Sequence, residues 1–303
     1  MGKILVTAAS GHLGRKTLQH LLKRRPASDL IGLARDPQKA GDLAAQGIEI
    51  RKGDYLDYDS LLNAFAGVEK LMLISCAPFT DRNMQHYNAI TAARQVGVKH
   101  VAYTAIIRRE GSDFNLSECT APDIFAEQTL KASGLTYTIV RQPAFLETFQ
   151  FQFGDQVYEK GLRVPVGNGK QAPASREDIA EAQAVVLTEQ GHDNKTYSLT
   201  GYPAVSYADI VQILSDARGV PVPLISVTDE EYIANYAAEG LPEPYAAFAL
   251  EWVHGANLGE WSDLTGDLER LIGHTPLTTA EYLRDNYPTP VSSIEAARGN
   301  KAG

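Results

Sequence analysis

The chain opens with the apolar run Lys3-Ile-Leu-Val-Thr7, followed directly by the small-residue stretch Ala8-Ala-Ser-Gly-His-Leu-Gly14. The apolar run predicts a buried strand, and a helix is expected to begin near His12. A strand that enters a helix through such a turn directs unpaired backbone N–H groups and the positive helix end at one spot. That arrangement suits a pyrophosphate, so residues 8–14 are predicted to bind a dinucleotide.

The glycine spacing and the second strand indicate whether the turn would bind a dinucleotide, and whether that would be NAD or NADP(H). The usual fingerprint has three glycines, whereas here Ala8 takes the first place and Gly11 and Gly14 take the other two. The second strand, over 29–34, ends at Arg35, where enzymes that use NAD carry an acidic residue for the ribose 2′-hydroxyl. Arginine favours a 2′-phosphate and therefore NADP(H), although Arg35 could also simply solvate a strand end.

Strand and helix patterns then alternate regularly. Strands are expected at 3–7, 30–34, 48–51, 70–74, 100–104 and 137–140, with helices between them. This alternation predicts an α/β protein with a Rossmann-type doubly wound parallel sheet. We expect a dinucleotide-binding domain over 1–145, then a mixed segment and smaller, mostly helical C-terminal lobe over 146–287 that caps the strand ends, with a strand at 196–199 returning to the sheet. Residues 288–303 are predicted to be a loosely packed tail.

Composition narrows the class of protein. A net charge of −9, with no basic run longer than Lys23-Arg24-Arg25, argues against a nucleic-acid partner. No apolar stretch is long enough for a membrane span, and no secretory leader precedes the first strand. The two cysteines, Cys76 and Cys119, indicate no disulfide framework, so a cytoplasmic location is expected. The seven histidines show no metal-ligand spacing, and no metal site is predicted.

Several segments, taken in order, resemble one family. They are residues 7–14, 34–40, 53–55, 97–104, 141–145 and 175–178. Together they resemble the NmrA-like branch of the atypical short-chain dehydrogenases/reductases, and within it the triphenylmethane reductases and type 2 NADPH:quinone oxidoreductases. The resemblance covers nearly all of residues 1–285 and implies NADP(H) bound at the sheet, with a substrate cleft roofed by the C-terminal lobe.

The resemblance also implies positions for the cofactor. It places the pyrophosphate on Ala8, Ala9, Ser10, Gly11, His12 and Leu13, and the 2′-phosphate on Arg35. It places the nicotinamide beside two strand exits, one formed by Ser75, Cys76 and Ala77 and the other by Arg141, Gln142, Pro143, Ala144, Phe145 and Leu146. Arg176 would touch the cofactor from the second lobe. Two other interpretations stay open: residues 75–77 as an ordinary small-residue strand exit, and Arg176 as a surface side chain.

The chain lacks a tyrosine–lysine pair, and this restricts the kind of reaction that it could catalyse. Typical short-chain dehydrogenases use a tyrosine with a lysine four positions on, but none of the 14 tyrosines here has that lysine. The related quinone reductases carry a lysine on the helix before the sixth strand, where this chain has Gln128 beside Glu127. Hydride transfer to a quinone or cationic dye needs no strong general acid, because the charge is delocalised or cancelled, and positioning is the main requirement.

Aromatic side chains would suit such an acceptor. Phe145 and Phe149 are predicted substrate residues, and Phe79, Tyr232 and Trp252 are further candidates by location. We therefore predict an NADPH-dependent reductase of quinones, triphenylmethane or azo dyes, or similar conjugated electrophiles. The alternative is a redox sensor that binds NADP(H) without turnover. No catalytic residue is assigned, and the substrate and oligomeric state stay open.

Overall fold

The computed structural model describes residues 2–149, 157–238, 240 and 242–287. The predicted tail at 288–303 lies outside these residues.

A seven-stranded sheet forms the centre of the first part of the chain. Its strands are β1 (Lys3–Val6), β2 (Leu30–Ala34), β3 (Glu49–Lys52), β4 (Val68–Leu73), β5 (His100–Ile106), β6 (Thr136–Gln142) and β8 (Lys195–Ser198). Their order is β3-β2-β1-β4-β5-β6-β8, and every neighbouring pair is parallel. The predicted Rossmann-type sheet is confirmed, with β8 as its seventh strand. The order reverses between β1 and β4, which is where ligands bind in open α/β sheets.

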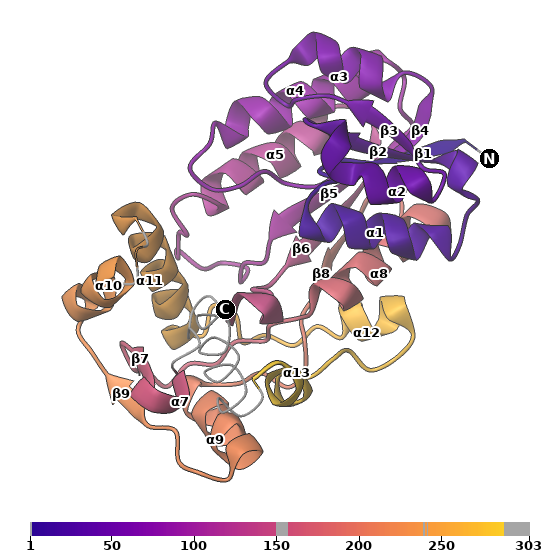
Figure 1. Cartoon of the computed structure of the whole chain (residues 1–303). Helices are drawn as coiled ribbons and strands as arrows, with labels where there is room; N and C mark the ends of the chain where they lie inside the picture. The colour runs from indigo at the N-terminus through magenta and orange to yellow at the C-terminus, as the bar shows by residue number, and fades with distance from the viewer. Residues whose placement is uncertain (1, 150–156, 239, 241, 288–303) are drawn as a thin grey trace, which may run out of the picture.

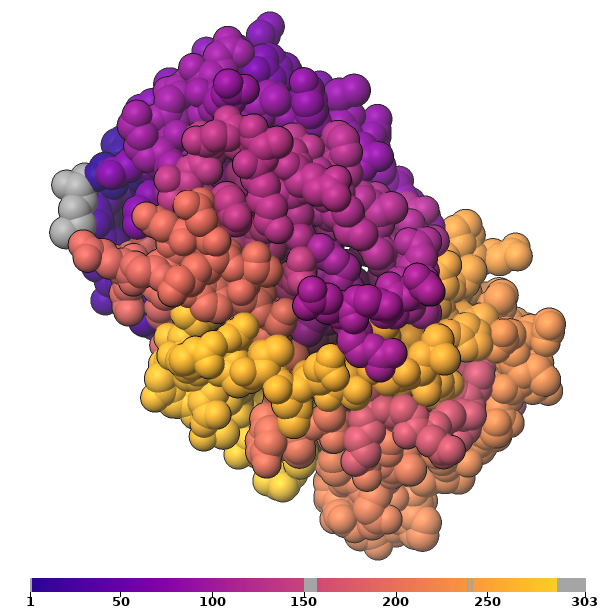
Figure 2. Space-filling view, turned by 180° about the vertical axis from the view of Figure 1, so that it is seen from behind, coloured from indigo at the N-terminus to yellow at the C-terminus, as the bar shows by residue number. Residues whose placement is uncertain are grey.

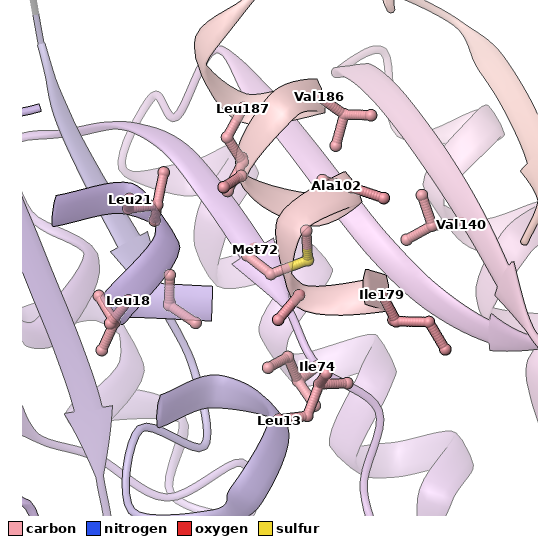
Figure 3. Close-up of a cluster of buried hydrophobic side chains, with 14 of the residues drawn as sticks. Leu13, Leu18, Leu21, Met72, Ile74, Ala102, Val140, Ile179, Val186 and Leu187 are labelled. Atoms are coloured by element: carbon pink, nitrogen blue, oxygen red, sulfur yellow. The ribbon is translucent and has the colours of Figure 1, made fainter. Parts of the chain in front are cut away.

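Helices cover both faces of this sheet (Figure 1). One face carries α1 (His12–Leu22), α2 (Gly41–Ala45) and α8 (Arg176–Thr188), and the other carries α3 (Tyr58–Phe65), α4 (Arg82–Gln95) and α5 (Thr120–Ala132). Successive strand residues point to opposite faces, so Ile4 and Val6 join one core cluster and Leu5 the other. Figure 3 shows the first cluster, where side chains of α1 and α8 converge on Met72 and Ala102.

The rest of the chain forms the predicted smaller lobe. It contains α7 (Val157–Lys160), α9 (Tyr207–Arg218), α10 (Asp229–Ala238), α11 (Glu243–Asn257) and α13 (Thr279–Asn286), with a small parallel sheet of β7 (Leu162–Val164) and β9 (Leu224–Ser226). The lobe has its own apolar core. In Figure 2 the chain after α11, drawn in yellow, runs along the boundary between the lobe and the sheet part. On this path α12 (Asp267–Ile272) packs against α8.

Short 3-10 helices complete the described elements: η1 (Ala27–Asp29), η2 (Pro37–Ala40) and η3 (Leu146–Thr148). None of the helices in the described part of the chain has the length and apolar character needed to cross a bilayer.

The turn between β1 and α1 depends on two small residues. Ala8 adopts a φ of 50°, in the left-handed region that favours glycine, and its carbonyl accepts a hydrogen bond from Gly11 N–H at 2.9 Å. A Cβ on Gly14 would lie 2.4 Å from that same carbonyl oxygen. The third glycine of the fingerprint is therefore required for close packing, whereas alanine in the first place is tolerated with backbone strain.

A buried carboxylate joins α5 to β6 and to the residues that follow β5. Glu127 of α5, whose side chain is 3% exposed, accepts hydrogen bonds from Arg108, after β5, and from Arg141 of β6. Burial opposes ionisation of this carboxyl, but the hydrogen bonds from Arg141 and Arg108 outweigh it and lower the pKa of Glu127. The folded state is therefore stabilised when Glu127 is ionised.

Ala8→Gly should raise the free energy of unfolding by about 0.5 to 1 kcal/mol, because glycine adopts the left-handed conformation without the Cβ penalty. Urea denaturation of both proteins measures the difference. Gly14→Ala is the matched variant and should lower the free energy of unfolding by about 1 to 3 kcal/mol. A destabilised Ala8→Gly protein would contradict the strain assigned to Ala8.

Glu127→Gln should lower the free energy of unfolding by about 2 to 3 kcal/mol at pH 7, because two arginines lose a charged partner. The lowered pKa of Glu127 means that its contribution is present above its ordinary value of 4.5 and is lost as the pH falls through the lower folded value. The wild type and variant should therefore converge in acid. Urea titrations between pH 3 and pH 7 test this, with the exposed Glu110→Gln as a control expected to show no such convergence. A difference in the free energy of unfolding that does not change with pH would contradict the lowered pKa assigned to Glu127.

Candidate functional site

The start of α1 is arranged to receive an anion. Gly11 occupies the N-cap and offers no side-chain hydrogen bond to the first turn, which also contains no acidic residue. The amides of that turn are thus left to a ligand, and the helix dipole favours negative charge there. Around this point Ala9 is buried, Ser10 and His12 are exposed, and Arg35 is exposed just past the end of β2. These positions fit a pyrophosphate on the turn and a phosphate near Arg35.

A cavity of about 460 Å³ begins beside this turn and extends to α11. Its walls come from the N-terminus of α1, the segments that follow β4 and β6, the end of β5, and the first residues of α4, α5 and α8. The structure brings together eight of the predicted cofactor residues on these walls: Leu13, Ser75, Cys76, Gln142, Pro143, Ala144, Phe145 and Arg176. A molecule whose phosphates lie on the turn could therefore place its other end in this cavity.

Several predicted residues lie elsewhere. Ala77 is exposed and does not line the cavity. The Arg141 side chain pairs with Glu127 instead, because neighbouring strand residues point to opposite sides and Gln142 is the one that faces the cavity. The Arg141 side chain is thus not on the cavity wall, and a cofactor role for Arg141 stays a prediction.

In the segment after β6, too, some side chains line the cavity and others point away from it. Residues three apart share one side of the short helix η3, so Phe145 and Thr148 line the cavity. Leu146 and Phe149 take the opposite side and are fully buried in the core of the lobe. Phe149 therefore does not offer its ring to a substrate in this cavity, contrary to prediction.

A buried ion pair supports the polar wall of the cavity. Arg82 and Asp123 are 5% and 1% exposed, and Arg82 Nη2 donates to Asp123 Oδ1 at 2.6 Å. The same carboxylate accepts from the Tyr103 hydroxyl and from Ile106 N–H, each at 2.7 Å. Arg82 also donates to Ser75 Oγ at 2.9 Å and to the Cys76 carbonyl. The pair thus fixes the segment after β4 relative to the end of β5.

Beside the charged Arg82–Asp123 pair, four other titratable groups stay neutral at physiological pH: His86, Tyr103 and the Cys76 and Cys119 thiols. Burial, together with the Arg82 charge, lowers the pKa of His86 to about 3. Burial raises the pKa of both the Cys76 and Cys119 thiols, to about 12 for Cys119. Burial also raises the pKa of Tyr103 well above its usual value. Neither a thiolate nor an acid with a pKa near 7 results from these shifts.

Aromatic side chains of α11 form the opposite wall. Tyr245, Phe248 and Trp252 line the cavity, and Trp252 was among the candidates from the sequence. On the sheet side the Arg176 guanidinium lies over the Phe145 ring at 4.5 Å. Tyr232, another candidate, is buried in the core of the lobe instead, where its hydroxyl donates to Tyr236. The cavity is therefore aromatic on the lobe side, and on the sheet side the polar groups of Ser75, Gln142 and Arg176 lie among mainly apolar side chains.

The sequence did not single out Arg82, Asp123, Tyr245 or Phe248. Arg82 directly follows its own helix cap, Asp81, and lies shortly after a predicted strand exit, which was the only local signal for it. Gln128, considered as the counterpart of a lysine, is exposed, whereas its neighbour Glu127 faces inward. Among the described residues that line the cavity there is one tyrosine, Tyr245, and no lysine.

Comparison of the sequence with known proteins identifies relatives of this chain. The profile of an NAD(P)H-binding family matches residues 8–190. The chain is 36% identical to quinone oxidoreductase 2 of Escherichia coli, over 92% of this chain and 96% of the relative. It is 31% identical to the NAD(P)H azoreductase of Xenophilus azovorans, over 93% and 96% of the two chains.

A solved structure covers nearly the whole described chain. Triphenylmethane reductase of Citrobacter sp., complexed with NADP(H), superimposes with a TM-score of 0.86 at 34% identity and covers 93% of this chain and 99% of that one. The expected family resemblance is thereby confirmed. The chain belongs to the NAD(P)H-binding family, among the oxidoreductases related to quinone oxidoreductase 2 and triphenylmethane reductase.

Proposed function

We propose that this protein is an NADPH-dependent reductase that transfers hydride to a quinone, a triphenylmethane or azo dye, or a similar conjugated electrophile. The observation that carries the proposal is one continuous cavity, from Leu13 at the phosphate turn to the aromatic face of α11. The names of the relatives support it, since they include a quinone oxidoreductase, an azoreductase and a triphenylmethane reductase.

The cofactor would be held by residues already described. The turn from Ala8 to Leu13 would bind the pyrophosphate, and exposed Arg35 would bind the 2′-phosphate. Ser75, Cys76 and Gln142–Phe145 would then border the nicotinamide, with Arg176 reaching it from α8. When bound, NADPH supplies the hydride.

The protein's own contribution would be position and shielding. Phe145, covered by the Arg176 guanidinium, and Trp252 of α11 would offer aromatic surfaces to a planar acceptor in the cavity. The aromatic wall excludes water from the space where the acceptor would lie. The neutral His86 and the two thiols would not supply an acid, which suits an acceptor whose reduced form spreads its charge over a conjugated system.

Three parts of the proposal rest on sequence alone. The cytoplasmic location stays a prediction from cysteine usage, and the absence of a nucleic-acid partner stays a prediction from net charge. The division into parts at 145 and 287 stays a proposal, since β8 and α8 come after residue 145 and yet belong to the sheet part.

The purified protein should oxidise NADPH only when an acceptor is present. The absorbance of the reduced nicotinamide is followed with benzoquinone, naphthoquinone, a triphenylmethane dye and an azo dye as separate acceptors. Acceptor-dependent loss of absorbance is the expected result. Binding of NADPH and NADP⁺ with comparable affinity and no turnover would instead favour the redox sensor.

Arg35→Ala should weaken NADPH binding by about tenfold to a hundredfold and leave NADH binding nearly unchanged, because only NADPH has the 2′-phosphate. Fluorescence titration of both cofactors measures the two dissociation constants. Arg24→Ala, at the opposite end of α1, is the matched control and should alter neither constant. An equal loss for both cofactors in Arg35→Ala would show that the phosphate assignment is wrong.

A further inference from the structure

Phe79 has an unusual backbone conformation for a large side chain. Its φ is 60°, and among the described residues only Ala8 and Asn194 are other non-glycine residues with a positive φ. The left-handed region is unfavourable for a bulky residue and persists only where the surroundings impose it. Phe79 N–H donates to Glu118 Oε2 at 3.0 Å, which helps to hold this conformation.

The strained backbone directs the Phe79 ring across to the lobe. Its centroid lies 4.7 Å from that of Tyr245 and 5.8 Å from that of Phe248, which it meets edge-on. Tyr245 and Phe248 line the cavity from α11, and Pro78, the residue before Phe79, lines it from the segment after β4. Phe79 is 38% exposed and does not itself line the cavity. The Phe79 ring therefore joins the segment after β4 to α11 at the edge of the cavity.

The α11 wall is also held by other contacts. Glu251 of α11 accepts a hydrogen bond from Ser117 N–H at 2.8 Å. Buried Glu260 accepts from Arg109 N–H at 2.7 Å and from the Ser112 hydroxyl. These bonds fasten the end of α11 and the residues after it to the loop between β5 and α5. Loss of the Phe79 ring would consequently remove the contact between the segment after β4 and α11, while these hydrogen bonds keep the α11 wall in place.

We propose that the Phe79 side chain, by bridging Pro78 and α11, sets the upper size limit for the acceptor that enters the cavity. This inference rests on the proposed reductase function. Removing the ring joins the cavity to solvent at this point, so planar acceptors of three fused rings gain access relative to acceptors of one ring. Phe79 is thus a specificity-determining residue that acts through the width of the opening.

The test uses a series of neutral quinones that differ in size: benzoquinone, naphthoquinone and phenanthrenequinone. Phe79→Ala should raise the ratio of kcat/KM for phenanthrenequinone to that for benzoquinone by about tenfold. Phe79→Gly should give the same result and relieves the positive φ, so it guards against a folding defect in the alanine variant. Phe79→Tyr keeps the ring and should retain the wild-type ratio.

Phe125→Ala is the matched control, because Phe125 of α5 is 40% exposed and does not line the cavity. Its ratio should equal that of the wild type. An unchanged ratio in both Phe79→Ala and Phe79→Gly would overturn the proposal. A raised ratio in Phe79→Gly beside an unchanged ratio in a folded and active Phe79→Ala would also overturn it, since backbone relief rather than loss of the ring would then be responsible.

A second measurement separates this proposal from the reductase function. Trp252 lines the cavity, and the ring of Trp261, the second of the chain's two tryptophans, lies 4.9 Å from the Trp252 ring. Quenching of intrinsic fluorescence therefore reports the entry of a quinone into the cavity. In stopped-flow experiments with NADP⁺ present, the association rate of phenanthrenequinone should rise about tenfold in Phe79→Ala. If the wild type turned over no quinone, the reductase function would fail while this rate still tested the size limit. An unchanged rate would overturn the size limit.

Discussion

The cavity depends on the ion pair between Arg82 and Asp123. Each residue lies in the first turn of its helix, Arg82 in α4 and Asp123 in α5, and both are almost fully buried. The carboxylate is favourably placed near the positive end of α5, and it also accepts the amide of Ile106. Removing one partner would leave an uncompensated charge in the protein interior. The positions of Ser75, Cys76 and the end of β5 are therefore maintained by the same interaction.

The fold was largely predictable because its signals are local. Apolar stretches mark β1, β2, β4 and β5 in the sequence, and the right-handed crossover between parallel strands limits the orders that the sheet can take. Boundaries differ by one or two residues, as with β4, which begins at Val68 rather than at residue 70. Some of the residues singled out at the strand exits line one cavity, since the carboxyl ends of parallel strands converge whatever the details of packing.

The directions of individual side chains were harder to predict. Gln142 and Arg141 are adjacent in the sequence, yet the alternation along β6 sends one to the cavity and the other to Glu127. The 3-10 geometry of η3 separates Phe145 from Phe149 in the same manner. The contacts of Arg82 with Asp123, and of Phe79 with Tyr245, join segments 41 and 166 residues apart, and no local pattern encodes such pairs. The aromatic wall could be found only after α11 had been placed over the sheet.

The uncapped start of α1 has a consequence for the stability of the whole protein. A helix that begins at glycine, without a side-chain partner for its first amides, forgoes the stabilisation that a serine or aspartate cap provides, typically about 1 kcal/mol. An anion that binds there supplies the missing partner, and only the folded chain presents those amides together. By linkage, each tenfold rise in ligand concentration above the dissociation constant adds about 1.4 kcal/mol to the free energy of unfolding. The fraction of chains that are folded would then rise with the supply of whatever phosphate-bearing molecule occupies the turn.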